Sequence, residues 1–200
     1  MALVVTTLQS QLLATFRAMD GILDGSGDRY MADNVAANIK AYILAGETST
    51  TDEGAAPAGS YSGKGTGYMT IDDSALAEDL YDTFTACYDN DGLASHMAAD
   101  IDKACSAENT VTETSSGMVA TPGGVSAFSG LAQGKFSGDK SSIESAMKAS
   151  FSAMDGMSAG GNEHFAAKLA SAVDSYLKNG DIVVSLKSPF TSGTGEGKIA

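Results

Sequence analysis

Apolar residues recur at four-residue spacing in three stretches of the chain, and each stretch ends on a phenylalanine. The phenylalanines Phe16, Phe84 and Phe151 lie 68 and 67 residues apart. Four and eight residues before each one stands another apolar residue: Leu12 and Leu8, Leu80 and Leu76, and Met147 and Ile143. This spacing predicts three helices with one apolar face each. Hydroxyl residues at their starts predict helix N-caps: Thr6, Thr7, Ser74, Ser141 and Ser142.

A second periodic segment follows each of these helices after a polar break. Its apolar positions have matching members in the three stretches, represented by Ile39, Ile101 and Val173. The four-residue period predicts a second helix in each case. These helices end near residues that favour a left-handed helix stop, namely Gly46, Asn109 and Gly180.

β-branched residues then predict strands at 48–51, 110–114 and 182–186. The chain has three prolines, and one falls in the turn region after each of these strands: Pro57, Pro122 and Pro189. Beyond each turn small residues alternate with larger ones, starting from Gly63, Gly130 and Gly193. Alternation puts the small residues on one face of a strand, so we expect another part of the chain to pack closely against that face.

The pattern therefore predicts an α+β fold made of three tandem pseudo-repeats of about 67 residues. The units run over residues 1–67, 68–135 and 136–200, each in the order helix, helix, strand, strand. No linker separates them, so we expect one compact pseudo-threefold body. The alternative is three separate beads.

The candidate chemical motifs are incomplete. The alternating glycines lack the G-x-G-x-x-G spacing of a dinucleotide loop, which favours a packed strand. The turn aspartates, Asp24 with Asp28 and Asp89 with Asp91, do not fit a calcium loop. Neither His96 nor His164 recurs between the units. We therefore expect that the protein is not an enzyme and that it binds no metal, no cofactor and no small-molecule substrate.

The two cysteines occupy positions that are apolar in the other units. Cys87 aligns with Met19 and Met154, and Cys105 aligns with Ile43 and Leu177. An antiparallel helix pair would hold them too far apart for a disulfide. We expect free thiols.

Charge narrows the choice of partners. The chain carries a net charge of −13, and residues 68–135 contribute −9 of it. Such a field repels nucleic acid and anionic lipid. Much of this excess negative charge lies around the start of one predicted helix, at Asp72, Asp73, Glu78, Asp79 and Asp82. These residues form either a solvated face or a docking surface for a basic partner. No apolar run is long enough to span a membrane and no secretory signal is evident, so we expect the protein to act where it is made.

The helix pair, the threonine-rich strand and the Ser-Gly-x-Gly-x-Gly ending together resemble virion structural proteins of tailed bacteriophages. The resemblance lies in residues 39–51 with 62–69, 101–136 and 173–199. It implies a non-enzymatic subunit of a virion, either a head decoration or cement protein or a tail or baseplate component. Its partners would be other virion proteins or copies of itself. The alternative is a carbohydrate- or surface-binding adhesive module, with Tyr61, Tyr68 and Tyr88 as stacking platforms.

Overall fold

The computed structural model describes residues 3–56, 59–86, 88–187 and 192–200. The α+β class is confirmed, because these ranges form pairs of helices that alternate with pairs of strands. The helices are α1 (Val5–Met19), α2 (Gly27–Ala45), α3 (Asp73–Thr85), α4 (Asn90–Cys105), α5 (Ser141–Met154) and α6 (Gly161–Asn179). The strands are β1 (Thr48–Ala56), β2 (Gly59–Met69), β3 (Val111–Thr121), β4 (Gly124–Ser137), β5 (Asp181–Lys187) and β6 (Ser192–Ile199).

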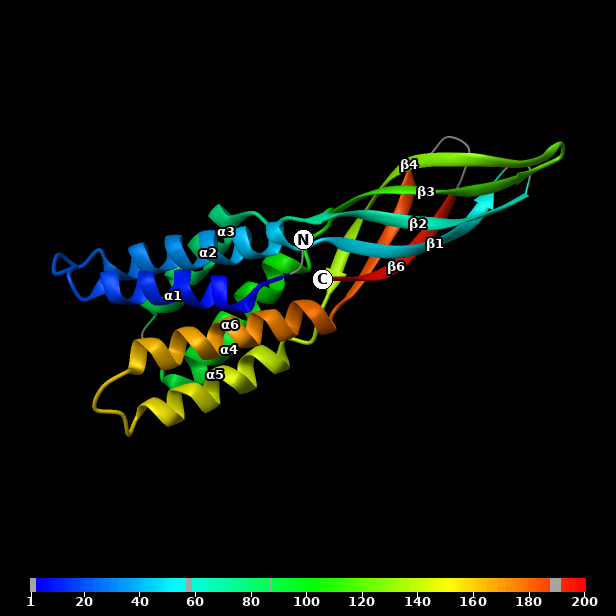
Figure 1. Ribbon diagram of the computed structural model, residues 1–200. Coiled ribbons are helices and arrows are strands. Elements are labelled where there is room, and N and C mark those ends of the chain that lie inside the picture. The colour runs from blue at the N-terminus through cyan, green and yellow to red at the C-terminus, as the bar shows by residue number, and fades with distance from the viewer. Residues whose placement is uncertain (1–2, 57–58, 87, 188–191) are drawn as a thin grey trace.

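Helices and strands occupy opposite halves of an elongated molecule (Figure 1). Each helical hairpin points one way and the β-hairpin that follows it points the other way, so the chain returns repeatedly to a waist between the halves. The two ends of the chain also lie at this waist. Each of the three stretches 1–67, 68–135 and 136–200 therefore contributes to both halves, and none forms a separate bead.

The strands form a closed antiparallel barrel in chain order, from β1 to β6 and back to β1. Thr48 at the start of β1 pairs with Gly67 of β2 on one side and with Ile199 of β6 on the other. Closure buries one face of every strand inside the barrel, where side chains must fill the space. This geometry explains the alternation in the sequence.

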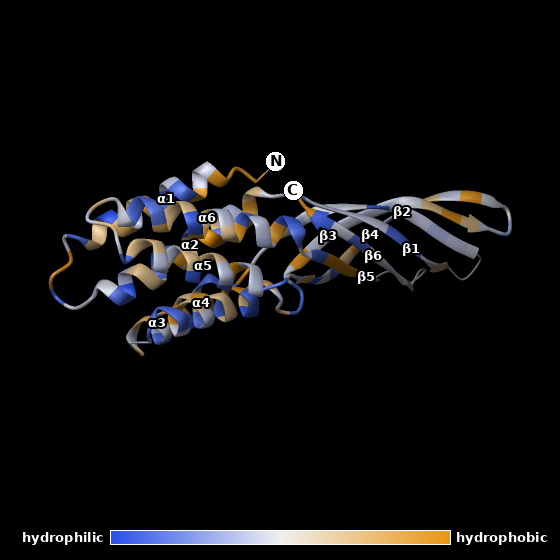
Figure 2. Ribbon diagram, turned by 90° about the horizontal axis from the view of Figure 1, so that it is seen from below, coloured by the Kyte–Doolittle hydropathy of each residue, from blue (hydrophilic) through white to orange (hydrophobic). Residues whose placement is uncertain are grey.

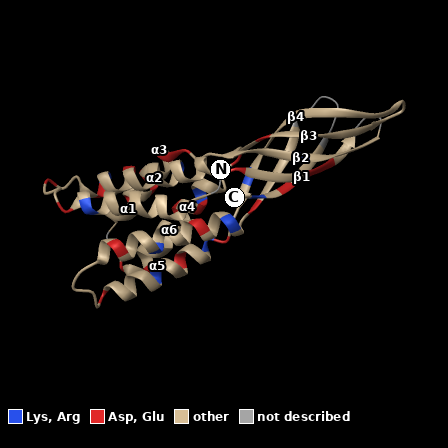
Figure 3. Cartoon of the chain, viewed as in Figure 1, with Lys and Arg blue, Asp and Glu red and all other residues tan. Residues whose placement is uncertain are grey.

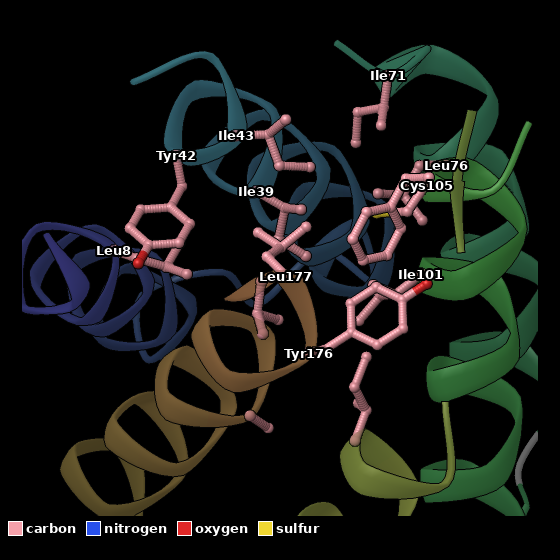
Figure 4. Close-up of a cluster of buried hydrophobic side chains, with 14 of the residues drawn as sticks. Leu8, Ile39, Tyr42, Ile43, Ile71, Leu76, Ile101, Cys105, Tyr176 and Leu177 are labelled. Carbon is pink, nitrogen blue, oxygen red and sulfur yellow. The ribbon is translucent and has the colours of Figure 1, made fainter. Parts of the chain in front are cut away.

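The helices form a ring in the same order, because each of α1 to α6 contacts the helices before and after it and α6 contacts α1. Side chains of α2, α4 and α6 meet in the core, as Figure 4 shows for Ile39 and Ile43, Ile101 and Cys105, and Tyr176 and Leu177. Val173 of α6 is fully buried as well. The apolar face predicted for the second helix of each pair is the face that fills this core.

The phenylalanines that end the first helices differ in their surroundings. Phe16 and Phe151 are buried, and both rings contact Phe165 of α6 at centroid distances of 5.1 and 5.2 Å. Phe84 is only partly buried. The three rings therefore have unlike surroundings: Phe84 is less covered, and Phe16 contacts a helix of the third stretch.

The predicted hydroxyl N-caps are wrong, because a carboxylate caps α3 and the cap residues of α1 and α5 make no side-chain hydrogen bond. Asp72 accepts hydrogen bonds from the backbone N–H groups of Ser74 and Ala75 at the start of α3. Asp139 accepts from the N–H of Ser141 at the start of α5. Thr6 and Thr7 lie inside α1, whose first turn has no side-chain cap. A carboxylate satisfies the free amides and also interacts favourably with the helix dipole.

Glycine at two helix ends serves close packing and not a left-handed turn. Gly46 and Gly180 have extended backbones, with φ values of −78° and −69°. A Cβ at Gly46 would come within about 3 Å of Leu3 and Ile199, and one at Gly180 would overlap the Phe136 ring. Asn109 alone of the three predicted stops is left-handed, with φ of 62°. The waist therefore requires glycine because the two halves approach each other closely there.

Candidate functional site

The barrel interior is filled by alternate strands. β1, β3 and β5 supply the inward-facing side chains: Thr48, Thr50 and Asp52, then Val111, Glu113 and Ser115, then Ile182, Val184 and Leu186. β2 and β6 present glycines at their matching positions, and β4 presents Gly130, Ala132 and Gly134. The middle of a six-stranded barrel is too narrow for side chains from every strand, so half of the strands present small residues there. Larger side chains of β2 and β4 are buried nearer the two ends, namely Tyr61, Met69 and Phe136.

Two carboxylates lie inside this barrel. Asp52 is fully buried and Glu113 is 1% exposed. The Thr50 hydroxyl lies 2.7 Å from Asp52 Oδ1 and 2.7 Å from Glu113 Oε2. The other oxygen of Asp52 accepts from Ser115, whose hydroxyl is also hydrogen-bonded to Tyr61. We call these five residues the barrel cluster.

Glycines create the room for the barrel cluster. A Cβ at Gly65 would overlap Thr50 Oγ1 and Glu113 Oε2, and a Cβ at Gly195 would overlap Asp52 Oδ1. The glycines predicted to face a closely packed neighbour therefore face polar side chains here. Sequence comparison between the units missed the cluster because the counterparts of Asp52 and Glu113 on β5 are Leu186 and Val184. The available signal was the alternation of side chains along a strand, because Asp52 lies two residues after Thr50 and four after Thr48, on the same buried face.

Aromatic rings close the barrel cluster toward the far end of the barrel. Tyr61 is 2% exposed and its ring contacts Phe128 edge-on at 5.1 Å. Burial, together with the charge of Asp52, raises the pKa of Tyr61, while the hydrogen bond with Ser115 opposes the shift. Tyr61 therefore cannot serve as an exposed stacking platform, and that part of the adhesive hypothesis is wrong. Tyr68 and Tyr88 are about half exposed.

A second candidate site is an apolar surface at the end of the β3–β4 hairpin. Met118 pairs with Ala127 and Ala120 pairs with Val125 across the two strands. Met118 is 50% exposed and Val125 is 66% exposed. We call these four residues the hairpin tip; it lies at the end of the molecule farthest from the helices (Figures 1 and 2). Pro122 is in the turn of this hairpin, whereas Pro57 and Pro189 lie outside the described residues.

The acidic residues proposed as a partner contact are mostly engaged within the chain. Asp73 pairs with Lys40 at 2.7 Å, Glu78 with Arg29 at 2.6 Å and Asp79 with Lys103 at 2.8 Å. The hydrogen bond from Lys40 lowers the pKa of Asp73. Asp72 caps α3, and Asp82 is exposed. Figure 3 shows that acidic and basic residues share the helical half, so part of the charge of this set is offset within the chain.

The remaining candidates from the sequence lie apart from one another. The Asp24 side chain accepts from Ser26, and that of Asp89 accepts from Gly92 at the start of α4. His96 stacks on Tyr88 at 4.1 Å, while His164 lies on α6. Cys105 is a free, buried thiol whose pKa is raised by burial, and Cys87 lies outside the described residues. Across the described ranges, no group of three or more His, Cys, Asp or Glu side chains is placed to hold a metal.

Neither a protein-family model, nor a curated protein, nor a solved structure matches this chain. Among the helices in the described part of the chain, none has both the length and the apolar character needed to cross a membrane.

Proposed function

We propose that this protein is a non-enzymatic structural subunit of a bacteriophage virion that acts through contacts with other virion proteins or with copies of itself. The observation that carries this proposal is the hairpin tip, an exposed apolar surface at one end of an elongated molecule. Exposed apolar patches on soluble proteins mark interaction sites more often than isolated apolar residues do. The barrel end is therefore the end that contacts a neighbour.

We also infer a pseudo-threefold repeat, and a repeat of this kind supports the same proposal. Tyr42 of α2 and Tyr176 of α6 occupy matching positions, 134 residues apart, and each donates to an aspartate on another helix of the core. The acceptors Asp174 and Asp102 also match each other, and both correspond to Lys40 in the first unit. Equivalent residues thus make equivalent bonds between units. A body of this kind can sit on a symmetry axis of a larger particle.

The three β-hairpins differ in a way that makes one of them the contact. β3 and β4 have 11 and 14 residues, compared with 9 and 11 for β1 and β2 and 7 and 8 for β5 and β6. The longest hairpin carries Met118 and Val125. Among the hairpin residues that the structure describes, this tip carries the exposed apolar pair, and we take it as the direction of attachment.

Incorporation into particles tests the proposal. Particles purified from the source of this chain should contain it, and the double variant M118S/V125S should be incorporated at a level at least tenfold lower. The matched control is Leu23→Ser, because Leu23 is 94% exposed at the opposite, helical end. Absence of the protein from particles contradicts the virion role, and equal incorporation of M118S/V125S contradicts the contact through the hairpin tip. Retention on a glycan array through Tyr68 or Tyr88 would favour the adhesive alternative.

A further inference from the structure

A pocket of about 510 Å³ lies at the waist, between the start of α3 and the end of α4. Its apolar lining consists of two large side chains and three alanines, namely Ile71, Leu76, Ala75, Ala104 and Ala107. Ile71 and Leu76 are buried at the base of α3, and Ala104 is partly buried on α4. A concave apolar surface of this volume is large enough to hold a side chain or a small molecule.

Ala104 occupies a position that is tyrosine in the other two stretches of the chain. The shifts of 62 and 72 residues that relate the predicted second helices align Ala104 of α4 with Tyr42 of α2 and with Tyr176 of α6. Both tyrosines are buried, with 2% and 1% of their surface exposed. Two of the three second helices therefore bury an aromatic ring at this level of the core, and α4 has only a methyl group there.

The tyrosine rings cover residues whose counterparts line the pocket. A Cβ at Gly138 would overlap the Tyr176 ring, and Gly138 corresponds to Ile71 of the pocket lining. In Figure 4 the tyrosine ring of α2 points toward Leu8, which corresponds to Leu76 of the same lining. The pocket is therefore the space that a third tyrosine ring would fill.

The pocket also offers acceptors for a phenol hydroxyl. Tyr42 and Tyr176 each donate to an aspartate carboxylate. Asp72 and Asp79 bring carboxylate oxygens to the pocket lining. Asp79 already accepts from Lys103 at 2.8 Å, but a carboxylate has about four acceptor positions and can accept a further hydrogen bond. The lining thus favours a tyrosine ring over a purely apolar one.

The charge around the pocket favours a cation beside that ring. The charged lining residues are three acids, Asp72, Asp79 and Glu108, and one base, Lys103. Glu108 also pairs with Lys135 of β4 at 3.0 Å. Three acidic and two basic side chains leave a local charge of −1, which one positive group on the occupant would balance.

We propose that this pocket binds a tyrosine side chain presented by a partner protein, with a lysine or arginine next to that tyrosine in the partner's sequence. A buried tyrosine is a common anchor of protein interfaces, because it fills a pocket with little loss of side-chain entropy and keeps a polar end. The pocket is at the waist and the hairpin tip is at the far end of the barrel. This inference therefore does not depend on the proposed virion function, and M118S/V125S should bind the probes described next as the wild type does.

Blocked dipeptides test the proposal on the ¹⁵N-labelled full-length protein by NMR titration. Acetyl-Tyr-Lys-amide should shift the amide signals of residues 70–76 and 103–110, which surround the pocket. Acetyl-Phe-Lys-amide should bind about threefold more weakly, because it lacks the hydroxyl. Acetyl-Tyr-Ser-amide should also bind about threefold more weakly at low salt, and the difference should vanish at high salt. Absence of shifts around the pocket, or equal affinity for the tyrosine and phenylalanine peptides, overturns the proposal.

A tyrosine placed in the pocket from within the chain provides a second test. Ala104→Tyr should raise the midpoint of guanidinium unfolding and abolish binding of acetyl-Tyr-Lys-amide. The control Ala153→Tyr adds the same ring at an exposed position near the end of α5, and it should change neither property. An Ala104→Tyr protein that is less stable than the wild type, or that still binds the peptide, overturns the match between pocket and ring. Self-association of the wild type that Ala104→Tyr abolishes would assign the pocket to a second copy and overturn the assignment to a different partner.

Discussion

The hydroxyl of Tyr176 on α6 donates a hydrogen bond of 2.6 Å to the carboxylate of Asp102 on α4. Both residues come from the inner helices of the ring, and the tyrosine ring also packs edge-on against Phe136 of β4 at 5.1 Å. Burial, with the nearby acidic groups, raises the pKa of Tyr176. One side chain thus joins two helices to each other and joins the helical half to the barrel.

Removing this hydroxyl should destabilise the protein measurably. Tyr176→Phe leaves the ring in place but deprives Asp102 of its donor, which costs about 1.5–3 kcal/mol for a hydrogen bond to a charged group. Urea unfolding at neutral pH measures the change. Tyr68→Phe is the control, because Tyr68 is 50% exposed on the barrel and should change stability by less than about 0.5 kcal/mol. Equal midpoints for the two variants would contradict the role assigned to the hydroxyl.

The barrel glycines should be intolerant of even one methyl group. Gly195→Ala places a Cβ on Asp52 Oδ1 and within 2.8 Å of Val184 Cγ2. Such overpacking costs about 1–3 kcal/mol. Gly123→Ala is the comparison, since no atom lies within 4 Å of its added Cβ. Denaturant unfolding should show Gly123→Ala near the wild type, and a Gly195→Ala protein of unchanged stability would mean that the barrel interior is looser than described.

The phenylalanines of the first helices should contribute unequally. Phe16→Ala removes a buried ring that contacts Phe165, and its expected cost is about 3–5 kcal/mol. Phe84 is only partly buried, so Phe84→Ala should cost less. Thermal unfolding of both variants gives the comparison. Identical losses would indicate that the three units are more alike than the packing of these rings suggests.

Asp100 should make the protein less stable as the pH rises. Burial raises its pKa, the charge of Asp79 adds to the shift, and hydrogen bonding from Thr83 and the charges of His96 and Lys103 oppose it. The folded state therefore binds the proton more tightly than the unfolded state does. The penalty is absent below the unfolded pKa, builds as the pH passes from the unfolded to the folded pKa, and remains at neutral pH.

Asp100→Asn removes that penalty while keeping an oxygen to accept the bond from Thr83, which is 2.7 Å in the wild type. Its melting temperature should exceed the wild-type value at pH 7 and match it near pH 3. Asp73→Asn should behave oppositely, because the hydrogen bond from Lys40 lowers the pKa of Asp73. Its loss of stability should be present at pH 7 and vanish as the pH falls below the folded pKa. The same sign for both variants at pH 7 would refute this assignment.

Local patterns predicted the elements but not how they join. The spacing around Ile39, Ile101 and Val173 predicts helices whose apolar faces are buried, and those faces do fill the core. The alternation from Gly63 predicts a strand with one crowded face. Barrel closure depends on pairing between residues far apart in sequence, such as Thr48 with Ile199, and no local period encodes such a pair.

The barrel cluster was harder to foresee for a different reason. A comparison of repeats emphasises what is shared, and Asp52 and Glu113 have apolar counterparts on β5. In a strongly acidic chain, an acidic residue is also usually interpreted as part of the solvent-exposed surface. Only the alternation of side chains along β1, which places Asp52 on the same inward face as Thr50, indicates that Asp52 is buried. The helix caps were mistaken because serine and threonine compete with aspartate for the same position, as Asp72 shows.

Closure of the barrel from β1 to β6 has a consequence for crowding. An open sheet exposes a row of unpaired amides and carbonyls at each side, and at high local concentration these groups recruit strands from other molecules. Here β1 and β6 pair with each other, so their backbone N–H and C=O groups are hydrogen-bonded within the molecule. Many copies can therefore be packed together without polymerising through strand exchange, and association must be specified by side chains, which mutation can tune one at a time.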